Sequence, residues 1–245
     1  MDSQLADGSW PAFPKLAEGC WVTSLACLAL WPHDLGQDAA LDGAYWLCRQ
    51  MPGEGKWNWR VRHQLFVHEE VVSQNHSLYG WPWTTGTASW VEPTAFALLA
   101  LGCIPAALLP AAAAKRRELA VAMLVDRECP GGGWNCGNPT VYGAAGRPLV
   151  GPTVWALLAL RNSTAHSSVA ESLDWIVTQT AFPRSTESLA LSELCLKSYA
   201  FARSSTEPEI RRRYESDKSS WSVPVLAWCV LSFRAAAARA FAASA

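Results

Sequence analysis

The sequence predicts an all-helical protein built from repeated helical hairpins that close into a ring. Three segments carry nearly the same apolar phrase, at residues 23–30, 94–101 and 153–160, and a Gly/Trp-rich loop precedes each one. One loop-plus-helix unit that recurs along a chain indicates a repeat architecture. Because the phrase is apolar on nearly all sides, each of these helices is expected to be buried all round, in an inner layer.

A second element comes before the loops. Residues 4–10 have the form Q-x3-G-x-W, residues 46–57 the form W-L-x2-Q-x4-G-x-W, and residues 124–134 repeat it with Glu in place of Gln. The predicted unit is therefore an amphipathic outer helix ending at Gln or Glu, a Gly-Trp loop, and an apolar inner helix. In these loops Trp10, Trp57 and Trp134 are expected to pin loop to helix.

The repeats predict one domain, residues 1–245, of about five hairpins. Residues 175–179 begin the pattern without the closing Gly-Trp loop, and a short fifth unit falls near residues 221–231. The ring is therefore expected to be incomplete or completed by a partner, either a second copy of the chain or another subunit. Residues 58–79 do not repeat and are expected to form an insertion, a surface or lid segment near the mouth of the ring.

The Q-x3-G-x-W element resembles the QW motif of squalene-hopene cyclases and related terpenoid cyclases, and the resemblance extends from residue 4 to about residue 228. It implies an α/α toroid, the ring fold that protein prenyltransferase β subunits share. It also implies a small terpenoid-cyclase-like enzyme, without a cofactor, acting on a polyisoprenoid or similar apolar substrate in a central cavity. The 14 Trp residues are consistent with an aromatic lining.

The segment from Trp90 to Ala95 carries the candidate catalytic residue. In protonation-initiated cyclases of this type, D-x-D-D-T-A stands at the start of an inner helix, and the resemblance places Glu92 at the proton-donating acid. Trp90 and Pro93 replace the other two aspartates. Burial would raise the pKa of Glu92 and keep it protonated. Alternatively, Pro93 begins the helix and Glu92 is a helix cap whose carboxylate the helix end stabilises.

Six aromatic side chains near the starts of the inner helices are candidates for substrate binding. Aromatic faces stabilise carbocations through their quadrupoles, the chemistry that a cyclase requires. The alternative is that the Trp residues only fix loops to helices. The candidates are Trp81, Trp83, Trp90, Trp134, Tyr142 and Trp155.

Two other functions stay open. A terpenoid-binding or scaffold protein would keep the ring without the acid chemistry. A zinc prenyltransferase would need an Asp-x-Cys pair and a distant His, and residues 126–129 have a different spacing, so no metal site is predicted. Cys129 and Cys136 flank the third loop. They could form a metal pair or a disulfide that staples the loop, or have no such role. His63 and His68 are five residues apart, which does not place both on one helical face.

Composition limits the partners. The net charge of −1 argues against nucleic-acid binding. The basic runs at 115–117 and 211–213 are expected at solvated ends of outer helices. The start of the chain lacks a secretory pattern, which predicts a cytoplasmic protein. Residues 93–114 are uncharged but broken by Pro and Gly, so two short buried helices are expected rather than a membrane span. A peripheral membrane contact would let a lipid-like substrate be collected.

Overall fold

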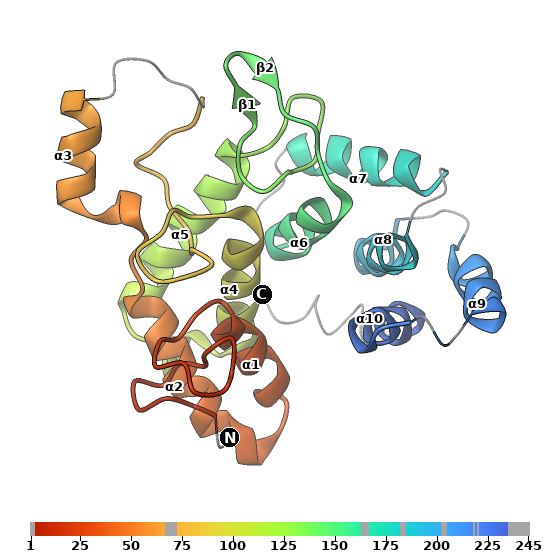
Figure 1. Cartoon of the computed structure of the whole chain (residues 1–245), viewed down its shortest axis with the longest axis horizontal. Helices are drawn as coiled ribbons and strands as arrows, with labels where there is room; N and C mark the ends of the chain where they lie inside the picture. The colour runs from red at the N-terminus through yellow and green to blue at the C-terminus, as the bar shows by residue number, and fades with distance from the viewer. Residues whose placement is uncertain are drawn as a thin grey trace.

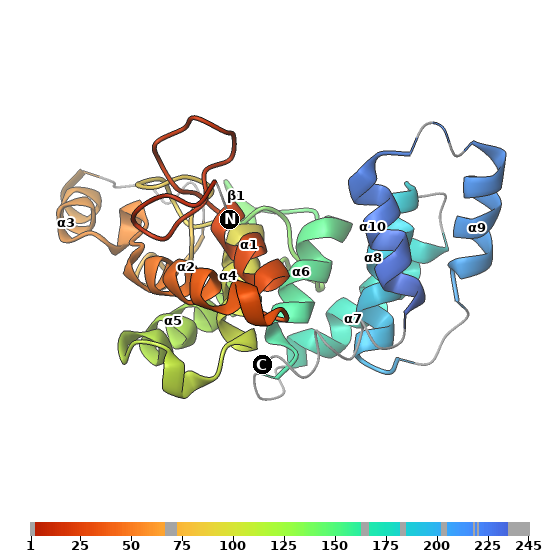
Figure 2. The ribbon, with the colours of Figure 1, turned by 90° about the horizontal axis from the view of Figure 1, so that it is seen from below.

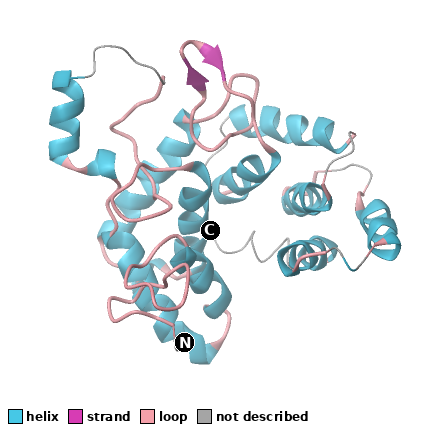
Figure 3. Cartoon of the chain, in the orientation of Figure 1, coloured by secondary structure: helices cyan, strands magenta, loops and turns pink. Residues whose placement is uncertain are grey.

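The computed structural model describes residues 3–66, 73–162, 167–181, 185–201, 205–217, 219 and 221–234. These residues are mostly helical, with one small two-stranded hairpin, which confirms the all-α prediction (Figures 1 and 3). The first half contains α1 (Val22–Leu30), α2 (Gln37–Arg49), α3 (Trp57–Phe66), α4 (Val91–Cys103) and α5 (Ala112–Asp126). The second half contains α6 (Val150–Leu160), α7 (Ser167–Thr180), α8 (Thr186–Ser198), α9 (Glu207–Ser216) and α10 (Val223–Phe233). Strands β1 (Thr140–Val141) and β2 (Ala144–Ala145) pair antiparallel, and short 3-10 turns cover Asp34–Gly36, Gly53–Gly55 and Ala106–Leu108.

The helices form successive hairpins. Helices α1, α4, α6, α8 and α10 pack side by side in chain order, and α2, α5, α7 and α9 each pack on the helix that precedes them. We call the first set the inner helices, after the layer in which the sequence predicts them. Figure 1 shows α6, α8 and α10 nearly end-on, and Figure 2 shows the same helices from the side. Within the described residues, α10 packs closely on α8 and has no comparable packing on α1.

The repeated apolar phrases become α1, α4 and α6, as predicted. Residues 93–101 of α4 and 152–158 of α6 are all buried, including Leu99 and Leu158, whereas Leu28 on α1 is partly exposed. A helix with apolar side chains on every side is removed from water only when other elements pack against every side. None of the described helices is both long enough and apolar enough to cross a membrane.

The same pair of hydrogen bonds fixes each Gly-Trp loop to the start of its inner helix. In each repeat a threonine Oγ1 accepts the tryptophan backbone N–H and donates to the carbonyl of the same tryptophan. The N–H bonds measure 2.9 Å for Trp10 and Thr23, 2.9 Å for Trp81 and Thr94, and 2.8 Å for Trp134 and Thr153. The reciprocal bonds measure 3.4, 3.4 and 3.1 Å. We call this arrangement the Thr–Trp clamp.

The second loop is built around Trp81, so the prediction for Trp57 is wrong. Trp57 begins α3 with 77% of its surface exposed, whereas Trp81 is 2% exposed and its indole N–H donates to the Leu47 carbonyl at 2.9 Å. The indole of Trp134 donates in the same way to the Leu124 carbonyl at 2.6 Å. Residues between Gln50 and Gly80 are thus inserted ahead of the true loop.

The insertion contacts the end of α5. The backbone N–H of Asn75 donates to Asp126 Oδ2 at 3.0 Å, and Leu78 packs against the main core. Residues 67–72 and the side chain of His63 lie outside the described part, so the spacing of His63 and His68 is not tested there.

One member of the first basic run is buried, contrary to the prediction of a solvated run. Arg116 on α5 is 5% exposed, and its Nη2 donates to the carbonyls of Gly80 at 2.8 Å and Gln50 at 3.2 Å. Its guanidinium lies 4.1 Å from the centre of the Trp81 ring, a cation–π contact. In the second run Arg211 and Arg212 are exposed and Arg213 is partly buried, and the three pair with Glu207 and Glu209.

Candidate functional site

Glu92 lies in the first turn of α4, one residue after the helix begins. The N-cap is Trp90, in extended conformation and without a side-chain cap bond, so the prediction that Glu92 caps the helix is wrong. The Glu92 side chain is half-buried, and its carboxyl makes no hydrogen bond or ion pair to any described residue. A carboxyl with this placement can exchange a proton without first breaking an internal bond.

The surroundings of Glu92 favour its neutral form. Burial raises its pKa above the ordinary value, and the negative charge of Glu187 raises the pKa further. The positive end of α4 acts in the opposite direction, because it favours the carboxylate. Glu187 lies in the first turn of α8 and is exposed. The fold therefore brings two carboxyl groups into electrostatic contact at the N-terminal ends of two inner helices.

The position two residues before the clamp threonine differs among the repeats: Trp21 before α1, Glu92 in α4 and Gly151 in α6. A Cβ added at Gly151 would lie 3.7 Å from Glu92 Oε1, so this carboxyl oxygen faces a helix start that carries no side chain. A methyl group at residue 151 would make ordinary van der Waals contact with this oxygen. Glycine at residue 151 thus leaves the space next to the Glu92 carboxyl open.

Near Glu92, aromatic rings form a continuous row: Trp83 comes from the second loop, Trp21 from the residue before α1, and Phe96, Trp155 and Trp228 from α4, α6 and α10. The centroid distances are 5.0 Å from Trp83 to Trp21, 5.8 Å from Trp21 to Phe96, 5.0 Å from Phe96 to Trp155 and 5.1 Å from Trp155 to Trp228. Phe96 follows Glu92 by four residues, so the two side chains share one face of α4. The row extends from α1 across α4 and α6 to α10. We call it the aromatic row.

The six predicted aromatic contacts have different fates. Trp83 and Trp155 belong to the aromatic row. Trp81 and Trp134 are 2% and 0% exposed and pin their loops, which leaves them no surface for a substrate. Tyr142 is 79% exposed in the β1–β2 turn, at a backbone φ of 50°, and faces solvent rather than an enclosed space.

The sixth candidate, Trp90, lines a small polar cavity with Glu54 and Arg127. Sequence reasoning missed Trp21, Phe96 and Trp228 of the aromatic row. Alignment on the clamp threonine would have found Phe96, because Phe96 and Trp155 each stand two residues after it.

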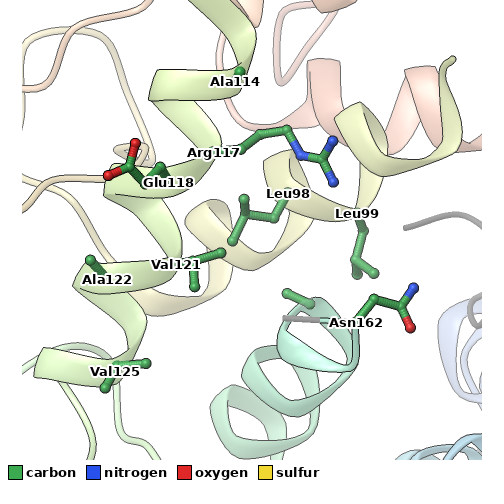
Figure 4. Close-up of a pocket in the computed structure, with 10 residues that line it drawn as sticks. Leu98, Leu99, Ala114, Arg117, Glu118, Val121, Ala122, Val125 and Asn162 are labelled. Carbon is green, nitrogen blue, oxygen red and sulfur yellow. The ribbon is translucent and has the colours of Figure 1, made fainter. Parts of the chain in front are cut away.

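An apolar groove lies elsewhere on the molecule. It has a volume of about 670 Å³ and runs between α4, α5 and α6, where Leu98, Leu99, Val121 and Val125 line it. Figure 4 shows these side chains with Arg117 and Glu118 at the α5 side and Asn162 just after α6. Leu98 and Leu99 follow Glu92 by about two helical turns, so this groove and the candidate acid are at different levels of α4.

Within the described residues, no group of three or more His, Cys, Asp or Glu side chains is arranged to hold a metal ion. Cys129 and Cys136 are both free thiols, so they do not form a loop staple. Burial raises the pKa of each thiol, which keeps both protonated near neutral pH.

The chain matches no protein-family model, no curated protein and no solved structure.

Proposed function

We propose that this protein is a small terpenoid-cyclase-like enzyme that binds a polyisoprenoid or similar apolar molecule along the aromatic row, with Glu92 as the acid or base. We further propose that the hairpins form part of an α/α toroid whose open side is closed by a second copy or a partner subunit. The observation that carries the proposal is a half-buried carboxyl at Glu92 that has no hydrogen bond or ion pair among the described residues, lies beside Gly151 at the start of α6, and shares a helix face with Phe96.

Protonation-initiated cyclisation needs two properties in its active site: a protonated acid and aromatic side chains that stabilise a carbocation. Protonation of an alkene needs a carboxyl group that is still protonated near neutral pH, and burial with a second carboxyl nearby raises the pKa of Glu92 in that direction. The resulting carbocation needs aromatic faces, which the half-buried rings of Trp21, Trp83 and Trp228 supply. At the end of the reaction the Glu92 carboxylate removes a proton from a carbon next to the cationic centre, which leaves an alkene product and regenerates the acid.

Glu187 takes a supporting role in this proposal. Two carboxyl groups that interact across a short distance share their protons, so one of them stays neutral to a higher pH than it would alone. Acids of the family that the chain resembles also act beside other carboxyl groups. Here the second group comes from α8 rather than from the same helix turn.

Product analysis with isoprenoid alcohols, isoprenoid diphosphates and squalene tests the proposal. Glu92→Gln preserves shape and should lower turnover by about 100-fold or more, because a positioned acid is lost. Glu187→Gln should retain turnover but shift its pH profile downward. Glu118→Gln, on the exposed side of α5, is the matched control and should leave turnover unchanged. Equal product yields from wild type and Glu92→Gln would refute the role of Glu92.

A non-catalytic terpenoid-binding or scaffold protein gives a different result in the same experiment. Neither wild type nor Glu92→Gln would form product, yet both would bind a polyprenyl ligand and quench Trp fluorescence. Zinc that co-purifies at one ion per chain would instead favour the prenyltransferase alternative. We propose a cytoplasmic location with peripheral membrane contact, since an apolar substrate resides in bilayers.

A further inference from the structure

A second, polar cavity lies beside the N-terminal end of α4, where the insertion meets the third loop. It has a volume of about 110 Å³, and Trp59 and Trp90 contribute aromatic walls. Glu54 and Arg127 contribute buried charges, 4% and 3% exposed. An apolar cavity of about 150 Å³ is known to hold a benzene molecule, so this space accepts a few non-hydrogen atoms or several waters.

Glu54 is only half satisfied. Its Oε1 accepts the backbone N–H of Ser89 at 2.8 Å, but the buried Oε2 has no hydrogen-bond partner among the described residues. A buried carboxylate oxygen without a partner costs free energy that a hydrogen-bond donor would recover. A hydrogen-bond donor from outside the described residues would therefore stabilise Glu54 Oε2.

Arg127 supplies donors to the same cavity. Its Nε pairs with Asp126 Oδ2 at 3.1 Å, and its Nη1 donates to the carbonyl of Gly137 at 3.2 Å and to the Gln74 side chain. Its second terminal nitrogen, Nη2, makes no hydrogen bond to any described residue, so its two N–H groups remain for an acceptor.

The charges around the cavity balance. Glu54 interacts electrostatically with both Arg127 and Arg116, and Asp126 pairs with Arg127, which makes two carboxylates and two guanidinium groups. A cationic ligand would be repelled by Arg127, and an anionic ligand would be repelled by Glu54. A neutral ligand disturbs neither balance and can use both groups.

We propose that this cavity binds a small neutral molecule that carries adjacent hydrogen-bond donor and acceptor groups, such as an amide or a urea. The ligand N–H donates to Glu54 Oε2, the ligand carbonyl accepts from Arg127 Nη2, and the flat group lies against Trp59 and Trp90. None of these contacts uses Glu92, so the site is independent of the proposed acid chemistry.

Three probes of the same planar shape test the proposal: acetamide, acetamidinium and acetate, which are neutral, cationic and anionic. Each is titrated into ¹⁵N-labelled protein while the indole N–H resonances of Trp59 and Trp90 are followed. Acetamide should shift both resonances saturably, and the two ions should bind at least about fivefold more weakly, because each meets one like charge. The exposed indole of Trp57 should not move and serves as the internal control.

Two variants make the test decisive. Glu54→Gln removes one negative charge, so the preference should change from acetamide to acetate. Ala88→Phe narrows the cavity from its exposed rim and should abolish binding of all three probes. If Glu54→Gln fails to fold, Ala88→Phe still decides the question. The proposal is overturned if acetamide gives no saturable shift in folded wild type, if an ion binds best, or if acetamide binding survives in Ala88→Phe.

Discussion

The Thr–Trp clamp makes a quantitative prediction that three separate sites can test. Replacing Thr153 with Val keeps the shape of the side chain but removes the hydroxyl that accepts the Trp134 backbone N–H at 2.8 Å. The carbonyl of Trp134 keeps a partner, because the Leu149 N–H also donates to it at 2.8 Å. One buried N–H is therefore left unpaired, which costs about 1–3 kcal/mol in the free energy of unfolding.

The same reasoning applies to Thr23 and Thr94, whose tryptophan carbonyls also accept a second backbone N–H, at 3.1 Å in both loops. Each Thr→Val variant should lower the melting temperature by about 2–4 °C for every kcal/mol lost. Thermal melts followed by circular dichroism measure this. Thr178→Val is the control, since that hydroxyl is exposed and its two hydrogen bonds, to the Trp175 carbonyl and from the Gln179 amide, both stay within its own helix. The reasoning is refuted if all three clamp variants melt with wild type.

Three further predictions address single residues. The folded-state pKa of Glu92 is raised above its unfolded value, so the folded protein loses stability as Glu92 ionises with rising pH. Glu92→Gln removes this loss and should therefore stabilise the fold more at pH 7 than at pH 4, as measured by urea titrations. Arg116→Gln should cost about 2–4 kcal/mol, because buried carbonyls lose a charged donor, whereas Lys115→Gln on the exposed face should change little in the same titrations. Gly133→Ala should destabilise more than Gly131→Ala: both glycines have positive φ, but only at Gly133 would a Cβ meet neighbours, 2.7 Å from Pro148 Cβ.

The inner helices were predictable because nothing but burial can satisfy helices that are apolar all round. The second loop was predictable from the Gly/Trp-rich residues 80–83 that precede the second apolar phrase, but not from the G-x-W spacing. Gly55 and Trp57 match that spacing, yet Gly80 and Trp81 form the loop, since a local pattern carries no information about how many residues are inserted. The Thr partner, 13 residues after the Trp in the first two loops, is the better signal.

The missed residues of the candidate site have a physical explanation. Glu187 begins α8, but the apolar phrase of that helix is interrupted by Glu193, which hid its place in the inner layer. Glu193 is buried because it accepts hydrogen bonds from the Thr206 N–H at 2.8 Å and the Ser205 hydroxyl at 2.7 Å, just before α9. Burial alone would raise the pKa of Glu193, but these hydrogen bonds, together with one from Lys197, lower the pKa below its ordinary value. Its charge thus fixes one hairpin to the next.

The two buried or half-buried glutamates of the inner helices show how structure and function separate in this fold. Glu193 is held by four hydrogen-bonding groups, and a neutral substitute would lose them. Glu92 has no such partners in the part of the chain that the structure describes, and a glutamine would fill its place without the cost of an ionised carboxyl in a half-buried site. The clamp threonine near it recurs in all three repeats that have a Gly-Trp loop, whereas the position of Glu92 holds Trp21 in one of them and Gly151 in another. Packing accounts for the threonine but not for the glutamate. The proton chemistry that we propose for Glu92 is a role that neither Trp21 nor Gly151 could take at the same position.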